Sequence, residues 1–301
     1  MIKVKNLSKS YGPVPAVKDI SFTVKEGFIY GLLGPNGAGK STTMNMICGC
    51  LATTKGEIFV NGHSITDEPI EAKRSIGYLP EIPPLYTDMT PFEYLEFVGL
   101  AKGLRREDLY NEIEYVMNKT GIDAVCDRLI KNLSKGYRQR VGIAQAIMGD
   151  PDIIILDEPT VGLDPIQIIE IRNLIRELGE EHTVIISSHI LQEIEAVCDR
   201  VIMISQGRIV ADDTLEALTE NETLEEAFIR LAGESLDAGA AYAMEKAAEK
   251  EARANERAER KGKKKIIVDK NGSGAYYTEI FVDEEPEIED ENEDCEIEEE
   301  E

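Results

Sequence analysis

The feature that most constrains this chain is the glycine-rich segment GLLGPNGAGKSTT at residues 31–43. The strand-like FIYGLL leads into it, and a run with Met44, Ile47, Cys48 and Leu51 on one helical face follows. In this context the spacing GxxxxGK[ST] predicts a phosphate-binding loop. Its glycines let successive backbone N–H groups turn toward one anion, and the helix N-terminus adds the positive end of its dipole. The segment therefore predicts binding of a nucleoside triphosphate.

Two side chains of this loop carry chemistry beyond that of the backbone. Lys40 would reach the β- and γ-phosphates, and the Ser41 hydroxyl would ligate Mg²⁺. The alternative is a glycine-rich turn with an incidental lysine, which the flanking strand and helix patterns disfavour. The loop residues predicted to bind the nucleotide are Gly34, Pro35, Asn36, Gly37, Ala38, Gly39, Lys40, Ser41 and Thr42.

A phosphate loop alone does not separate a GTPase, a kinase or a motor, but two later segments narrow the choice. In IIILDEP, at residues 153–159, an apolar strand delivers Asp157 to the Mg²⁺ shell, with Glu158 placed to polarise the attacking water. His189 follows the strand-like TVIIS and could contact the γ-phosphate. A lone histidine usually has no such role. His189, however, is placed at the end of a predicted parallel strand, where ligands of open α/β sheets bind, and this position favours a contact with the γ-phosphate.

Strand and helix patterns predict an α/β fold with a P-loop NTPase core. Alternating runs before residue 61, ending in the hairpin signal Asn61-Gly62, predict an N-terminal antiparallel β-subdomain. Helical spacing between about 88 and 148 predicts an inserted helical subdomain, with an apolar stripe of Leu109, Ile113, Val116 and Met117. Apolar strand-like runs then return at 152–156, 183–187 and 200–205, as expected for a buried parallel sheet.

A helix with its own start signal lies between the first two of these later strands. Asp164 is predicted to cap it, and Pro165 occupies the first helical position. Its predicted buried face consists of Ile168, Ile171, Ile175 and Leu178.

Composition limits the class of protein. No run of this 301-residue chain approaches the roughly 18–20 apolar residues that cross a bilayer, and the N-terminus lacks the apolar core of a signal peptide. The five cysteines lack metal-ligand spacing and are expected to be buried, reduced thiols. We therefore expect a soluble, cytoplasmic protein.

The net charge of −25 is concentrated at one end of the chain. Residues 283–301 hold 14 acidic and no basic residues, which leaves −11 for the rest. Within the charged extension 233–301 we expect a solvated helix at 242–265, a small hairpin at 265–284 and a disordered acidic tail. An acidic body disfavours nucleic-acid binding by the basic segment LSKGYRQR at 133–140, which otherwise reads as the start of an ordinary helix.

The ordered motifs GPNGAGKST, LSKGYRQR, ILDEP, VGLD and SSH resemble the nucleotide-binding domain of ATP-binding cassette (ABC) proteins, over about residues 1–230. The chain looks most like the ATPase subunits of ABC-2-type exporters, whose membrane domain is commonly a separate chain. The resemblance implies a domain over 1–232, ATP and Mg²⁺ as ligands, and a second nucleotide-binding subunit. It also implies an integral membrane permease, and hence a peripheral location on the inner face of the cell membrane.

The resemblance also implies roles for further residues. LSKGY stands where the family has LSGGQ, so Ser134 and Gly136 would contact ATP bound to the opposite subunit of a homo- or heterodimer. Tyr11 would stack on adenine, and Asp164 of VGLD would link the two sites. Glu81 stands at the family's glutamine position, which contacts Mg²⁺ and the membrane domain.

Lys135 and Tyr137 depart from the LSGGQ pattern, and Lys135 would either add charge at the γ-phosphate or point outward. The helical block is where a coupling helix of the permease would dock. The alternative function is a soluble ABC ATPase for cofactor or complex assembly, without a membrane partner. Translation factors of the family usually carry two cassettes, and DNA-maintenance members a long coiled coil, which residues 40–133 lack. A nucleoside kinase is a further alternative, but it would need neither LSKGY, at the position of the family's LSGGQ signature, nor the segment around His189.

Overall fold

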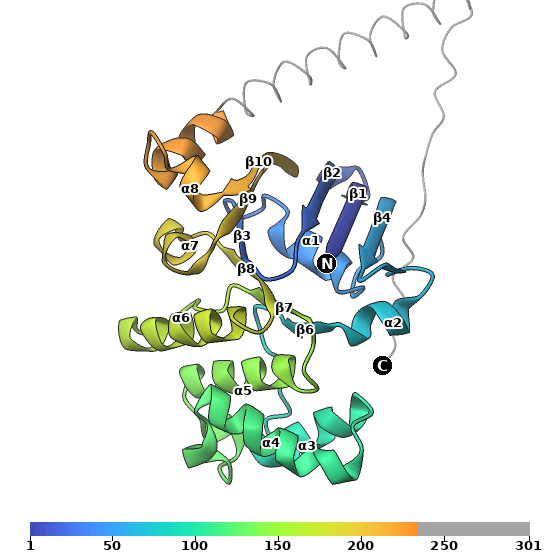
Figure 1. Cartoon of the computed structure of the whole chain (residues 1–301), viewed down its shortest axis with the longest axis vertical. Coiled ribbons are helices and arrows are strands. Elements are labelled where there is room, and N and C mark those ends of the chain that lie inside the picture. Colours follow the sequence, from blue (N-terminus) through green and yellow to red (C-terminus); the bar gives the residue numbers. More distant parts are fainter. Residues whose placement is uncertain (234–301) are drawn as a thin grey trace, which may run out of the picture. The chain divides into compact units, whose positions relative to one another are not determined.

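Two β-sheets and the helices around them make up residues 1–233, the part of the chain that this computed structural model describes (Figure 1). The smaller sheet has the strand order β2-β1-β4-β5. Its strands are β1 (Ile2–Tyr11), β2 (Val14–Val24), β4 (Lys55–Val60) and β5 (His63–Ser64). The larger sheet has the order β10-β9-β3-β8-β7-β6. Its strands are β3 (Ile29–Leu33), β6 (Ile76–Leu79), β7 (Ile153–Asp157), β8 (Thr183–Ser188), β9 (Arg200–Ser205) and β10 (Arg208–Thr214).

The smaller sheet is antiparallel, as the alternating N-terminal pattern predicts. Ile2 and Val4 are buried on one face of β1, while Lys3 and Lys5 between them are exposed. The predicted hairpin is present, with Val60 paired to His63. Asn61 and Gly62 between them have positive φ angles of 49° and 89°, as a two-residue turn that follows the strand twist requires.

The larger sheet is parallel from β9 to β6, and β10 is added antiparallel at one edge. All five residues of β7 are buried, because helices cover both faces of a parallel sheet. The predicted fold class is therefore confirmed. The sequence pattern did not identify β6 or β10, because β6 has four residues and β10 is a half-exposed edge strand with two aspartates.

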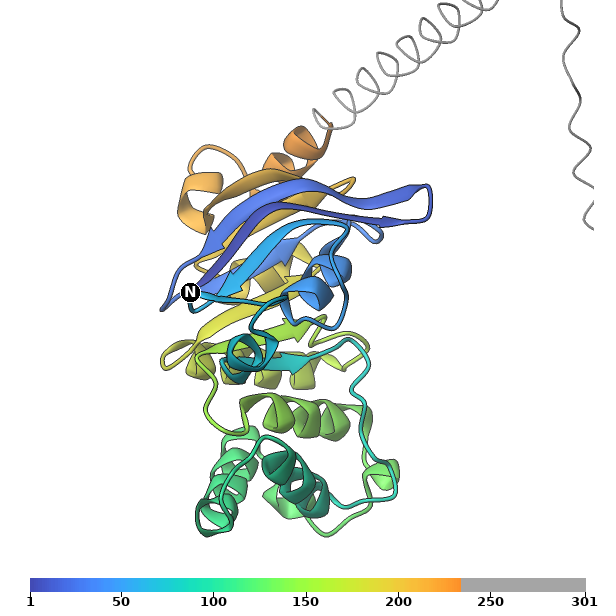
Figure 2. The ribbon, with the colours of Figure 1, turned by 90° about the vertical axis from the view of Figure 1, so that its right-hand side faces the viewer.

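The helices fall into two groups. Those of the predicted helical block lie together at the end of the molecule away from the smaller sheet (Figures 1 and 2). They are α3 (Pro91–Ala101), α4 (Arg106–Thr120) and α5 (Lys135–Ile147). The others are α1 (Lys40–Ile47), α2 (Pro69–Arg74), α6 (Pro165–Gly179), α7 (Leu191–Val197) and α8 (Leu215–Leu218), and residues 224–233 are also helical. No helix within residues 1–233 is long and apolar enough to cross a membrane.

The apolar faces predicted for the helices now labelled α4 and α6 are largely buried. The four stripe residues of α4 are buried in one core with residues of α3 and α5. On α6, Asp164 accepts hydrogen bonds from the N–H groups of Ile166 and Gln167, which confirms the predicted cap. Ile168 was predicted to be buried but is only half-buried. The reason is that the first turn of α6 lies beyond the core. 

The cysteine and C-terminal predictions have mixed outcomes. Cys48 and Cys198 are buried free thiols, as expected. Cys50 is exposed, which corrects that expectation, because it lies in the turn after α1. The predicted helix at 242–265, hairpin at 265–284 and acidic tail lie outside the described residues.

Lys102, the residue after α3, connects the end of that helix to the end of α5. Its Nζ donates to the carbonyls of Gln145, Ala146 and Met148 at 3.2, 3.3 and 2.6 Å. Burial lowers the pKa of Lys102 to about 8, so the side chain still carries its charge at neutral pH. It therefore satisfies helix-terminal carbonyls with a cation, which also suits the negative end of the helix dipole.

We expect Lys102→Met to lower the free energy of unfolding by about 1–2 kcal/mol, because two part-buried carbonyls and one exposed carbonyl lose a charged donor. Urea unfolding of the purified protein measures this change. Lys131→Met is the matched control, because its exposed pair with Asp88 contributes less than about 1 kcal/mol. Equal midpoints for the two variants would contradict the role given to Lys102.

Candidate functional site

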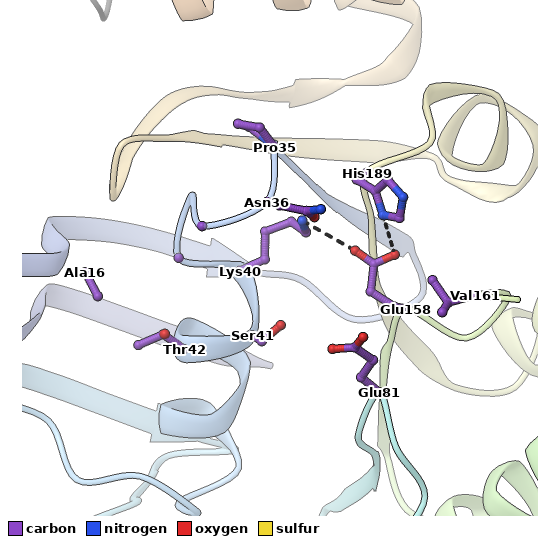
Figure 3. Close-up of a pocket in the computed structure, with 12 residues that line it drawn as sticks. Ala16, Pro35, Asn36, Lys40, Ser41, Thr42, Glu81, Glu158, Val161 and His189 are labelled. Carbon is purple, nitrogen blue, oxygen red and sulfur yellow. Dashed lines mark hydrogen bonds and ion pairs between the residues drawn. The ribbon is translucent and has the colours of Figure 1, made fainter. Parts of the chain in front are cut away.

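A cavity of about 680 Å³ opens at the carboxyl edge of the larger sheet (Figure 3). Because β3, β6, β7 and β8 run parallel, the loops that follow them meet at this edge. The cavity is lined by Ala16, Pro35, Asn36, Gly37, Gly39, Lys40, Ser41, Thr42, Glu81, Glu158, Val161 and His189. Seven of the nine predicted phosphate-loop positions line it, and the other two, Gly34 and Ala38, are buried.

The phosphate loop has the backbone geometry that its glycines predict. Gly37 and Gly39 have positive φ angles of 79° and 109°, and Gly39 caps the N-terminus of α1. A Cβ on Gly34 would lie 2.3 Å from the carbonyl oxygen of Ile204, so only glycine fits there. Lys40 is buried and donates from Nζ to the Gly34 carbonyl at 2.9 Å. The loop thus wraps around the lysine and directs free helix N–H groups toward the cavity.

Asp157, the last residue of β7, is held by two hydroxyl groups. Ser41 and Ser187 both donate to its Oδ1, at 3.2 and 2.5 Å. The Ser187 hydroxyl also accepts the backbone N–H of Glu158 at 2.9 Å. The end of β8 therefore fixes the end of β7, and the carboxylate of Asp157 lies beside the Ser41 hydroxyl.

Glu158 extends from β7 between two partners from other elements (Figure 3). Its Oε1 lies 3.4 Å from Lys40 Nζ, and its Oε2 lies 2.9 Å from Nδ1 of His189. The side chain is buried, and the residue has a positive φ of 50°, which is uncommon outside glycine. Such backbone strain is often found where a side chain must be directed at a ligand. A carboxylate beside the phosphate loop is placed to accept a proton from a water in the cavity.

Four predicted residues lie away from this cavity. Tyr11 ends β1 with 51% of its surface exposed, and Lys9 lies over its ring. Ser134 is exposed and caps α5 by accepting the N–H of Tyr137. Gly136 is buried against Gln167 of α6, and Asp164 caps that helix.

Lys135 does not extend away from the molecule. A Cβ on Gly162 would lie 2.2 Å from Lys135 Nζ, so the ammonium group rests against the loop between β7 and α6. Lys135 and this loop are therefore neighbours within one chain.

Sequence reasoning missed several residues of the site. Ala16 and Val161 line the cavity, and Ser187 links Asp157 to Glu158. Ser187 was counted as part of a strand. Its polar side chain at the carboxyl end of that strand was the available signal.

The parallel sheet and the phosphate loop at its carboxyl edge define a P-loop NTPase. The family described as ABC transporter matches residues 17–161. The ABC transporter ATP-binding protein NatA of Bacillus subtilis (strain 168) is 41% identical over 215 residues, covering 71% of this chain and 87% of NatA. The linearmycin resistance ATP-binding protein LnrL of the same organism is 40% identical over 215 residues, covering 71% of this chain and 69% of LnrL.

A solved structure of similar fold is a dimeric post-hydrolysis state of the ATP-binding cassette MJ0796, bound to ADP and Pi. It has a TM-score of 0.66 and 27% identity, covering 71% of this chain and 99% of that chain. The chain belongs to the ATP-binding proteins of ABC transporters. It is therefore an ATPase subunit of a transporter.

Proposed function

We propose that the chain hydrolyses ATP in the cavity beside Lys40 to energise export through a separate membrane permease. The observation that carries the catalytic part is the position of Glu158, held between Lys40 and His189 next to the phosphate loop. With ATP bound, Lys40 exchanges its contact with Glu158 for the β- and γ-phosphates. Glu158 then polarises the attacking water, and His189 keeps the carboxylate oriented and faces the γ-phosphate.

The residues near Ser41 suit Mg²⁺. Asp157 and Ser41 supply oxygen ligands beside the loop, and Glu81 faces the same cavity. Within residues 1–233 no three His, Cys, Asp or Glu side chains form a metal cluster. This fits Mg²⁺, which usually takes one or two protein oxygens and completes its shell with water and substrate phosphates. When bound, the ion would neutralise charge developing on the phosphates.

The residues outside the cavity support a dimer. Ser134 presents the N-terminus of α5 at the surface, where its first N–H groups suit an anion. Neither Ser134 nor Gly136 lines the cavity beside Lys40, so an anion at this helix would have to come from elsewhere. A second subunit, identical or related, would bring its phosphate loop to Ser134 and Gly136. Asp164 would then lie between the two sites, and Tyr11 would stack on adenine.

A second cavity supports a permease interface. It measures about 410 Å³ and is lined in part by Glu81, Ile82, Pro83 and Leu85. Ile82 is 82% exposed, and Glu81 lines both this cavity and the ATP site. An apolar residue so exposed suits a partner surface. A permease docked here would sense the γ-phosphate through Glu81, and the chain would act from the inner face of the membrane. The name of LnrL, a resistance protein, supports export.

Affinity purification of the tagged chain from detergent-solubilised membranes tests the transporter class. We expect an integral membrane protein in stoichiometric amount. Ile82→Asp should lower its recovery about tenfold, since a buried unpaired charge costs several kcal/mol. Ile70→Asp, at a residue 68% exposed on α2, is the matched control. A soluble partner alone would contradict export and favour an assembly ATPase.

A further inference from the structure

Glu193, in the first turn of α7, is a buried carboxylate that the proposed mechanism does not use. Only 3% of its surface is exposed. Within the described part of the chain, no lysine, arginine or histidine forms an ion pair with it. Its two oxygens instead accept hydrogen bonds from Thr160 Oγ1 at 2.6 Å and from Ser188 Oγ at 2.8 Å. A buried carboxyl group is costly to desolvate unless it is hydrogen-bonded, and here both of its partners are side-chain hydroxyl groups.

One hydroxyl group belongs to the loop after β7, which begins with Glu158, and the other to the last residue of β8, next to His189. Thr160 lies two residues after Glu158, and Ser188 immediately precedes His189. Both hydroxyl-bearing side chains are buried, at 4% and 1% exposure. The Ser188 hydroxyl also accepts the backbone N–H of Ile190 at 2.9 Å, which fixes the turn that contains His189. One carboxylate therefore connects the loop after β7 to the end of β8.

We propose that Glu193 is a positioning residue for ATP hydrolysis, which sets the distance between Glu158 and His189 by holding Thr160 and Ser188. This inference rests on the proposed roles of Glu158 and His189. The two hydrogen bonds are short, at 2.6 and 2.8 Å, so the bridge resists separation of Thr160 from Ser188. Ser187 already fixes the backbone at the end of β7. Glu193 adds a second connection, from Thr160 in the loop after β7 to Ser188 at the end of β8.

Steady-state kinetics of the full chain test the inference. Glu193→Ala should lower kcat roughly 30-fold, because small displacements of catalytic groups can cost up to about 100-fold. The KM for ATP should change less than about twofold, because the phosphate loop is held separately. Glu193→Gln should recover most of kcat, since its amide can still bond both hydroxyl groups. Glu195→Ala, at an exposed position on the same helix, is the matched control.

A double-mutant cycle separates positioning from a general loss of structure. In a His189→Ala background, Glu193→Ala should cost little further activity, because its effect passes through the pair already broken. Thr160→Val removes the hydrogen bond between Thr160 and Glu193 with little change of side-chain shape. It should reproduce most of the loss of kcat even if Glu193→Ala fails to fold. An equal loss in both backgrounds, or full activity of Thr160→Val, would overturn the inference.

A readout without ATP distinguishes failure of this inference from failure of the proposed function. The chain has three histidines, and the ring signal of His189 is assigned by its absence in His189→Ala. In NMR spectra of the nucleotide-free chain, Thr160→Val and Glu193→Ala should shift this signal, whereas Glu195→Ala should leave it in place. Unchanged shifts would refute the positioning role. Shifted signals with normal hydrolysis in Glu158→Gln would refute the proposed catalytic roles instead.

Discussion

Glu158→Gln is expected to lower the rate of ATP hydrolysis by roughly 10²- to 10⁴-fold, which is the usual contribution of a general base. The amide has nearly the same shape as the carboxylate and can still face His189, but it cannot accept a proton from water. Lys40, whose Nζ also bonds the Gly34 carbonyl, stays in the phosphate loop. ATP binding should therefore persist while turnover stops.

Two measurements on Glu158→Gln check this expectation. Phosphate release gives the rate, and gel filtration with ATP should show a stable dimer, because the closed state no longer decays by hydrolysis. Glu195→Gln is the control, since this carboxylate is exposed and outside the cavity. Residual hydrolysis above about a tenth of the wild-type rate would exclude Glu158 as the main base, since loss of a general base costs at least about 10²-fold.

Gly77→Ala is expected to destabilise the fold by about 3 kcal/mol or more, at the upper end of overpacking effects. Gly77 lies in β6 beneath α5, and a Cβ there would lie 2.1 Å from the carbonyl oxygen of Ala146. The backbone of α5 cannot yield as a flexible side chain would. The helix must move from the sheet, and it carries Ser134 and Gly136 at its start.

Urea or thermal unfolding of Gly77→Ala measures this loss. Gly233→Ala is the control, because a Cβ at that helical position meets no atom within 4 Å. Alanine there should be neutral or slightly stabilising, by up to about 1 kcal/mol. If the two variants unfold at the same midpoint, the close packing of α5 on β6 is not a determinant of stability.

The sequence alone determined the parts of this protein that depend on neighbouring residues. A strand, a glycine-rich turn and a helix form the phosphate loop within about a dozen residues, so the positions of Lys40 and Ser41 follow from local spacing. The cap at Asp164 and the turn at Asn61 are also local, because each needs only a few adjacent backbone groups.

Only the tertiary structure decided which loops meet. The strand order β10-β9-β3-β8-β7-β6 brings Asp157 and Ser187 together across 30 residues of sequence, and no local pattern encodes that pairing. The same holds for Gly77. Glycine is required at this position only because the backbone of α5 packs against it and leaves no room for a Cβ. No sequence motif marks Glu193, a polar residue of a short helix. Its burial between two loops depends on long-range packing, which hydrophobic periodicity along one segment does not specify.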